Sequence, residues 1–433
     1  MLRTAILLLI LLTAAIACIE VGDKFSGLAP GIWRAYLQLE SIPFTEDPAQ
    51  LSKGELVTEN QLPFQFEVIY ENDSDFYIEI INGEERIRVD DIYIGRNPAT
   101  ARDTIEIRFP LYESYIKGEF EAGMINGNWI VENRDNYLIP FVARFGQDYR
   151  FTSLVKTPKA DLTGKWDATF EIETDHPFPA VGEFVQEGNR LTGTFLTEIG
   201  DYRYLEGTVQ ANKFYLSCFD GAHSFLFQGR IEEDNTLIGS FSNGIHYATM
   251  WQAKRNPDAK LTDPNKLTFL KDGYDRLAFS FPNTSGELVS LNDERYKGKP
   301  KIIQIFGTWC PNCRDETEFL ASYIRENNVM DLEIIALAYE KRKDASKAMA
   351  TIQRYKKHFN VDYELLLAGP NDKTLAAETL PMLNHILSYP TMIFLDRNDR
   401  VRRIHTGFYG PATSEFENFK KDFNESLQMI LSE

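Results

Sequence analysis

Two cysteines three positions apart, Cys310 and Cys313, follow an apolar segment at residues 302–307 and precede a helix-compatible one. This spacing at a strand-to-helix junction is typical of a dithiol/disulfide redox site. Cys310 stands at the start of the expected helix, where unpaired backbone N–H groups and the helix dipole favour a thiolate. We therefore expect Cys310 to be the attacking sulfur and to be reachable from solvent. Cys313, one turn further along, is expected to be shielded and to displace whatever becomes bonded to Cys310.

A Cys-x-x-Cys pair can also be half of a zinc site, which needs further thiolate or imidazole ligands. The sequence has no second pair of this kind, and its histidines at 358, 385 and 405 show no ligand spacing relative to it. We therefore predict neither a metal nor another cofactor. Cys218 lies in an aromatic, strand-like segment and is expected to be a small core residue, with a spare reactive thiol as the alternative.

The chain as a whole has 433 residues, too many for one ordinary core, so two or three domains are expected. Its net charge of −18 argues against a nucleic-acid partner, because such partners are held by basic patches.

The amino end has one basic residue, Arg3, then an apolar run from Ala5 to Ala17, then Cys18. These features are typical of an export signal rather than a membrane span. The tetrad that ends at Cys18 resembles a bacterial lipobox, which implies a signal peptide at 1–17, lipid on Cys18 and an envelope protein that faces the periplasm. The alternative is ordinary cleavage after Ala17, which would release a soluble exported protein.

Residues 20–258 are rich in alternating apolar and polar runs broken by glycine turns, which predicts antiparallel sheets. One pattern occurs twice, so we expect a first β-rich copy at 18–155 and a second at 156–260. The matching stretches are Gly31-Ile32-Trp33 with Gly164-Lys165-Trp166, Gly118 with Gly229, and Gly127 with Gly239. The alternative is that meandering sheets share such starts by chance. We predict two related antiparallel sheets or barrels.

From residue 268 to residue 433 the pattern changes to alternating strands and helices, which predicts a thioredoxin-type α/β domain. The chain is therefore expected to be multidomain, with an all-β amino-terminal region before this domain. Expected strands are 302–306, 334–339, 363–367, 391–395 and 401–405, and expected helices are 312–326, 344–359, 374–387 and 416–430.

This last part resembles the TlpA/ResA-like thioredoxin family of exported thiol-disulfide oxidoreductases. The resemblance rests on residues 281–291, on Lys297-Gly298-Lys299-Pro300 and on the motif from Trp309 to Cys313. It implies a reversible Cys310–Cys313 disulfide. Peroxidase chemistry, which the same fold supports, is disfavoured because Gly307 stands where a threonine would be needed.

Further site residues are expected around the dithiol, and the resemblance implies the roles of Pro390 and Glu316. Pro390, within Ser388-Tyr389-Pro390-Thr391, is expected to be cis and to keep a backbone edge open beside Cys310 for an extended client. Trp309 and Tyr389 would line that client-binding edge. Glu316, three positions after Cys313, would be a buried acid that exchanges a proton with it. The alternative for Glu316 is a solvated residue on the first turn of the helix.

The resulting hypothesis is a membrane-tethered periplasmic thiol-disulfide oxidoreductase that reduces disulfides in exported client proteins. It would need a membrane thiol reductant as electron donor. A second hypothesis is a binding or sensor lipoprotein whose β-rich region recognises a ligand or partner, with the redox domain accessory.

Overall fold

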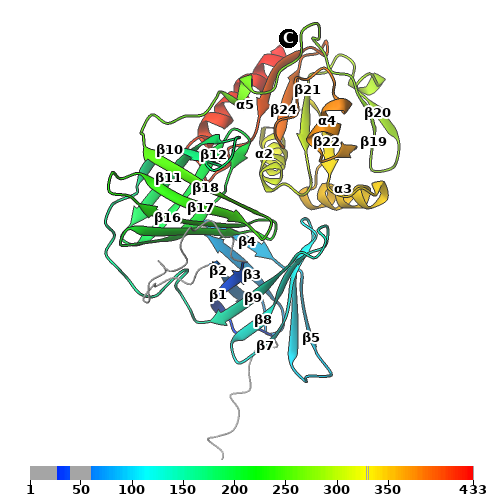
Figure 1. Ribbon diagram of the computed structural model, residues 1–433. Helices are drawn as coiled ribbons and strands as arrows, with labels where there is room; N and C mark the ends of the chain where they lie inside the picture. Colours follow the sequence, from blue (N-terminus) through cyan, green and yellow to red (C-terminus); the bar gives the residue numbers. More distant parts are fainter. Residues whose placement is uncertain (1–26, 40–59, 328, 330, 433) are drawn as a thin grey trace, which may run out of the picture.

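The computed structural model describes residues 27–39, 60–327, 329 and 331–432, so the expected signal peptide and the lipidation residue Cys18 lie outside it. Two nine-stranded antiparallel sheets are followed by an α/β unit built on a five-stranded sheet (Figure 1). This arrangement confirms the expected fold class. In the described part of the chain, no helix is long and apolar enough to cross a membrane.

The first sheet is a meander in the order β4-β3-β2-β1-β9-β8-β7-β6-β5. Its strands form where apolar and polar residues alternate, as in β6, where Ile105, Ile107 and Phe109 are buried and their neighbours are more exposed. The strands are β1 (Gly31–Gln38), β2 (Gln61–Tyr70), β3 (Phe76–Asn82), β4 (Glu85–Val89), β5 (Ile92–Arg96), β6 (Asp103–Phe109), β7 (Ser114–Glu121), β8 (Met124–Val131) and β9 (Leu138–Phe145).

The second sheet closes into a barrel, because β11 pairs with both β10 and β12 and β10 pairs with β18. We call it the second barrel. Cys218 is a fully buried residue of β15, as expected. The strands are β10 (Gly164–Phe170), β11 (Phe178–Glu187), β12 (Arg190–Thr197), β13 (Gly200–Asp201), β14 (Leu205–Gln210), β15 (Lys213–Phe219), β16 (Ser224–Ile231), β17 (Leu237–Asn243) and β18 (Tyr247–Arg255).

The two sheets make equivalent contacts at the residues where the sequence pattern occurs twice. Trp33 donates its ring N–H to the carbonyl four residues earlier at 2.9 Å, and Trp166 does the same at 2.9 Å. Gly118 is the cross-strand partner of Gly127, and Gly229 is the partner of Gly239. A Cβ at Gly127 would stand 2.1 Å from the carbonyl oxygen of the facing strand, and one at Gly239 would stand 2.4 Å from it. Both sheets thus need glycine where two strands approach closely.

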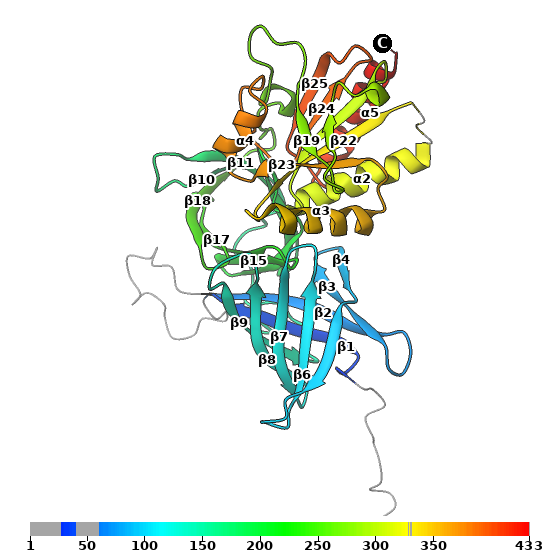
Figure 2. The ribbon, with the colours of Figure 1, turned by 90° about the vertical axis from the view of Figure 1, so that its right-hand side faces the viewer.

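The α/β unit has the strand order β23-β22-β21-β24-β25, with β21, β22 and β23 parallel and β24 antiparallel to β21. Helix α3 lies beside α2 (Figure 2), and rings of α5 pack on Phe319 of α2. The elements are β19 (Ser280–Pro282), β20 (Leu288–Ser290), β21 (Lys301–Phe306), α2 (Pro311–Asn327), β22 (Glu333–Glu340), α3 (Ala345–Phe359), β23 (Glu364–Pro370), α4 (Lys373–Thr379), β24 (Thr391–Leu395), β25 (Val401–Thr406) and α5 (Phe416–Ser432), with short 3-10 turns at Pro264–Lys266 and Glu294–Tyr296.

The sequence prediction for the third helix is wrong in length. A helix was expected over 374–387, whereas α4 ends at Thr379. Leu380 precedes Pro381, and a residue before proline is disfavoured in helical conformation, so the chain turns there. The other strands and helices of this unit agree with the prediction to within a few residues.

Candidate redox site

The two cysteines lie at the junction between β21 and α2. Cys310 directly precedes the helix, whose first residue is Pro311, as the sequence predicted. The backbone N–H of Cys313 donates to Cys310 Sγ at 3.3 Å. Both residues are free thiols in this structure. A helix N-terminus that offers an N–H to Cys310 Sγ stabilises negative charge on that sulfur, so Cys310 is suited to be the nucleophile.

Cys313 is the shielded member of the pair, with no exposed surface. Burial, together with the neighbouring Cys310, raises the pKa of the Cys313 thiol well above its ordinary value. Its backbone is held as well, because the Tyr355 hydroxyl lies 3.1 Å from the Cys313 carbonyl oxygen and 2.9 Å from Thr317 Oγ1. A base is therefore needed before Cys313 can attack.

Glu316 is placed to act as the base for Cys313. It is fully buried, and Gln304 Nε2 donates to its Oε2 at 2.8 Å. Burial raises the pKa of Glu316 to about 8, although the Gln304 hydrogen bond opposes the rise. Its Oε1 has no hydrogen-bond partner among the described residues. The expectation of a buried acid is confirmed, and such a carboxyl can change its protonation state near neutral pH.

The peptide bond between Tyr389 and Pro390 is cis, as predicted. It brings the Tyr389 carbonyl to 3.4 Å from Cys310 Sγ, which is placed to donate its S–H. Trp309 stands edge-on to the Tyr389 ring at 5.7 Å between ring centroids, and its Nε1 donates to the Tyr339 carbonyl at 2.9 Å. Trp309 and Tyr389 thus form one side of the site.

Sequence reasoning missed two further residues, Glu340 and Lys341. Glu340 accepts from the Thr308 N–H at 3.0 Å and from its hydroxyl at 2.7 Å, and burial raises its pKa to about 7. Lys341 Nζ lies 4.5 Å from the centroid of the Trp309 ring, and burial lowers its pKa to about 8. Glu340 is the last residue of β22 and Lys341 follows it, next to the end of β21 that carries the dithiol. The parallel pairing of these strands was the signal that could have identified them.

The expectation that Cys310 is reachable from solvent is wrong for this structure, because Cys310 is only 7 % exposed. The β-rich region lies against this face of the α/β unit. The Asp201 carbonyl accepts from Asn312, one of the two residues between the cysteines, at 3.3 Å, and the Ile199 carbonyl accepts from the Ser388 hydroxyl at 2.7 Å.

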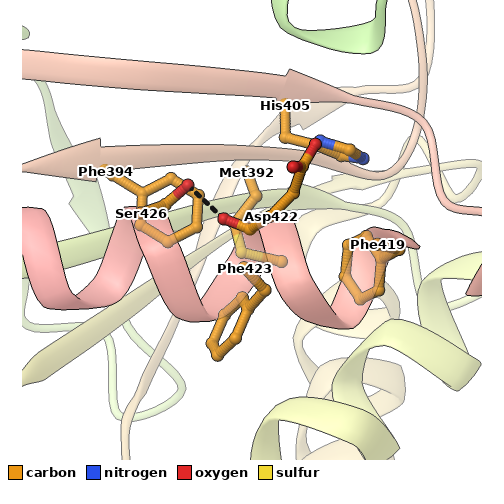
Figure 3. Close-up of a pocket in the computed structure, with 7 residues that line it drawn as sticks. All are labelled: Met392, Phe394, His405, Phe419, Asp422, Phe423 and Ser426. Atoms are coloured by element: carbon orange, nitrogen blue, oxygen red, sulfur yellow. Dashed lines mark hydrogen bonds between the residues drawn. The ribbon is translucent and has the colours of Figure 1, made fainter. Parts of the chain in front are cut away.

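A small enclosed space near α5 is unrelated to the dithiol (Figure 3). Burial lowers the pKa of His405, which lines it, to about 4. No residue of the redox site borders this space. Its lining residues are Met392, Phe394, His405, Phe419, Asp422, Phe423 and Ser426.

Comparison with known proteins found one matching family and several similar proteins. The Redoxin family matches residues 271–422. The thioredoxin-like protein YneN of Bacillus subtilis (strain 168) is 25% identical over 34% of this chain and 78% of its own length. The thiol-disulfide oxidoreductase ResA of the same organism is 23% identical over 32% of this chain and 69% of its own. A crystal structure of a thiol:disulfide interchange protein of the thioredoxin family from Chlorobium tepidum TLS has a TM-score of 0.28 and 20% identity, over 36% of this chain and 95% of that one.

Proposed function

We propose that this protein, whose residues 271–422 form a Redoxin domain, is a thiol-disulfide oxidoreductase that reduces disulfide bonds in exported client proteins. The observation that carries the proposal is the 3.3 Å hydrogen bond from the Cys313 N–H to Cys310 Sγ at the start of α2. The cis bond before Pro390 and the buried carboxyl of Glu316 support it. The names of the related proteins, thiol-disulfide oxidoreductase among them, agree with this class of reaction.

The reaction starts when the Cys310 thiolate attacks one sulfur of a client disulfide. The client S–S bond breaks, the second client sulfur leaves as a thiolate that takes up a proton, and a mixed disulfide with Cys310 remains. Glu316 then accepts the proton of Cys313, and the Cys313 thiolate attacks Cys310 Sγ. This step forms the Cys310–Cys313 disulfide, breaks the bond between Cys310 and the client, and releases the remaining client sulfur as a thiolate that takes up a proton. Two electrons and two protons pass from the dithiol to the client.

Each turnover leaves the protein oxidised, so a thiol donor must reduce it again. We place the protein at the cell envelope, tethered by lipid on Cys18 and supplied by a membrane thiol reductant. The amino-terminal sequence supports this placement, because an apolar run ends at Cys18 in a lipobox-like tetrad.

Insulin reduction tests the proposal. Cys310→Ser and Cys313→Ser are each expected to abolish turnover, and Cys313→Ser is expected to accumulate mixed disulfides with clients. Cys218→Ala is the matched control, because it removes a cysteine thiol buried in the second barrel, away from the dithiol. The reductase function is wrong if the wild-type protein turns over no faster than the two active-site variants.

A ligand-binding role for the β-rich region remains the second candidate, because that region contacts the redox face. The interior of the second barrel offers little room for a ligand. Its rings Phe170, Phe195, Phe227 and Trp251 are fully buried and lie 5.0 to 6.3 Å apart, centroid to centroid. Trapping with Cys313→Ser and mass spectrometry separates the two roles: many captured clients indicate a general reductase, and none indicates a binding protein.

A further inference from the structure

We propose that the loop at residues 197–203 of the second barrel covers the client-binding edge beside Cys310, so that the site reacts with protein disulfides only after this loop has moved away. The inference rests on the proposed function, since it concerns access of clients to the same sulfur. Figure 1 shows the α/β unit lying against the β-rich region, and the loop joins the two where α2 begins.

The first observation is the position of the loop backbone next to the cis-proline. The Ile199 carbonyl accepts from the Ser388 hydroxyl at 2.7 Å. A Cβ placed on Gly407 would lie 3.2 Å from the carbonyl carbon of Ile199 and 3.4 Å from the Gly200 nitrogen. Gly407 in turn donates its N–H to the Pro390 carbonyl. The loop backbone thus lies along the segments that flank Pro390, where an extended client segment would have to pair.

The second observation is the contact with the dithiol helix itself. Asn312 donates to the Asp201 carbonyl at 3.3 Å, and a Cβ on Gly200 would stand 2.3 Å from Asn312 Nδ2. The Asp201 carboxylate also accepts the Gly410 N–H at 2.7 Å. The loop therefore contacts Asn312, between the two cysteines, as well as the cis-proline side, and Cys310 itself is 7 % exposed.

The third observation is a buried ionic cluster that fixes the loop. The Arg203 guanidinium pairs with Asp315 of α2, with Glu85 of the first sheet at 2.5 Å and with Asp220 of the second barrel at 3.5 Å. The Arg203 side chain is only 6 % exposed. One cation thus joins both β sheets to the helix that carries Cys313. If the Arg203 guanidinium moved away, several carboxylates would lose the positive charge that balances them.

The first sheet closes the opposite side of the site. Glu113, in the turn between β6 and β7, pairs with Arg342 at 2.9 Å and with Arg354 at 3.4 Å. Arg342 follows Lys341, whose ammonium group lies over the Trp309 ring. Most of the named contacts across both boundaries are hydrogen bonds and ion pairs. Two small apolar contacts lie beside them, where Leu111 packs against the α/β core and where Val181 and Leu196 meet Tyr409. An interface that is largely polar can separate and re-form between domains. Sulfur-to-sulfur attack needs direct access for the client sulfur, which the closed arrangement denies to a folded protein.

Substitution of Gly200 tests the loop without changing any residue of the redox site. Gly200→Ala places a methyl group against Asn312 and should lift the loop. Gly188→Ala is the matched control, because Gly188 also has a positive φ, of +61° against +138° at Gly200, but a Cβ there would meet nothing within 4 Å. Glu113→Gln, which keeps the shape of the side chain, weakens the opposite boundary and serves as a second variant.

The measurement is alkylation of Cys310 in the reduced full-length protein by iodoacetamide and by a polyethylene-glycol maleimide of protein size, with unmodified Cys310 quantified by mass spectrometry. Wild-type protein and Gly188→Ala should react with the small reagent but slowly with the large one. Gly200→Ala should raise the large-to-small rate ratio roughly tenfold, the population change that corresponds to about 1.4 kcal/mol. Glu113→Gln should raise it in the same direction.

The inference is overturned if the wild-type protein reacts with both reagents at equal rates, or if neither Gly200→Ala nor Glu113→Gln raises the ratio. Alkylation needs no turnover, so it is separate from the test of the reductase. If Gly200→Ala shows the expected labelling ratio and still does not reduce insulin, the proposed function is refuted and the covering loop stands.

Discussion

Replacement of Glu316 by glutamine should change the pH dependence of stability in a way that follows from burial alone. The carboxyl has no exposed surface, and its pKa rises from 4.5 to about 8 on folding. Because the pKa of the Glu316 carboxyl is raised in the folded state, this carboxyl contributes its full stabilisation below pH 4.5. The contribution is lost as the pH rises through about 8, because over this interval the carboxyl ionises easily only in the unfolded chain. Over that interval the folded state loses roughly 4 to 5 kcal/mol relative to a neutral side chain.

Glutamine cannot ionise, and it can still accept from Gln304 as Glu316 Oε2 does. Glu316→Gln should therefore be close to wild type near pH 4.5 and clearly more stable near pH 8. Hydrogen exchange of the α2 amides in the reduced protein measures the difference, because comparison at one pH cancels the intrinsic exchange rate. Glu318→Gln makes the same change at an exposed position of α2 and should show no such trend.

The same substitution separates stability from catalysis. Without the carboxylate as base, breakdown of the mixed disulfide by Cys313 should slow, and the wild-type rise of this rate towards pH 8 should disappear. The reasoning is refuted if Glu316→Gln and wild type keep a constant difference in stability across this pH range. It is also refuted if a carbon-13 titration shows the Glu316 carboxyl ionising near its ordinary value.

Two further results are expected. Lys341→Met should slow alkylation of Cys310 at neutral pH by roughly fivefold, which corresponds to about 1 kcal/mol of charge interaction. Lys343→Met removes a lysine at an exposed position and should leave the rate unchanged. Equal rates for Lys341→Met and the wild-type protein would show that Lys341 does not act on the sulfur. Gly127→Ala should cost roughly 1 to 3 kcal/mol of stability, because its Cβ meets the facing strand; thermal unfolding against Asn126→Ala, an exposed change on the same strand, checks this.

The position of Cys310 before a helix could be predicted from the sequence, because a short motif determines it. The burial of Glu316 and the cis bond before Pro390 were implied by the family resemblance, and the structure has both. The repeat was detectable because two strands that approach closely need glycine at that position. Glycines therefore recur at equivalent places in the sequence, as at Gly118 and Gly127.

The covered state of Cys310 could not be predicted in this way. It depends on Ile199 and Asp201, more than a hundred residues earlier in the chain, and on how two β sheets dock against the α/β unit. No periodicity predicts such docking, because its contacts come from isolated polar and backbone groups and from a few apolar residues far apart in the chain. Glu340 and Lys341 were missed for a related reason, since only the pairing of β22 with β21 brings them to the site.

The hydrogen bonds around Thr317 have a mechanical consequence. Gln304 Nε2 lies 3.1 Å from Thr317 Oγ1, and the Tyr355 hydroxyl bridges that oxygen to the Cys313 carbonyl. Strand β21 and helix α3 thus hold the backbone of Cys313 and the Thr317 side chain from two directions. When the disulfide forms, Cys313 should stay in place, and Cys310 and the short connection before it should move. Oxidation of the dithiol should therefore first change the position of Trp309 and the surface that this residue presents to a client.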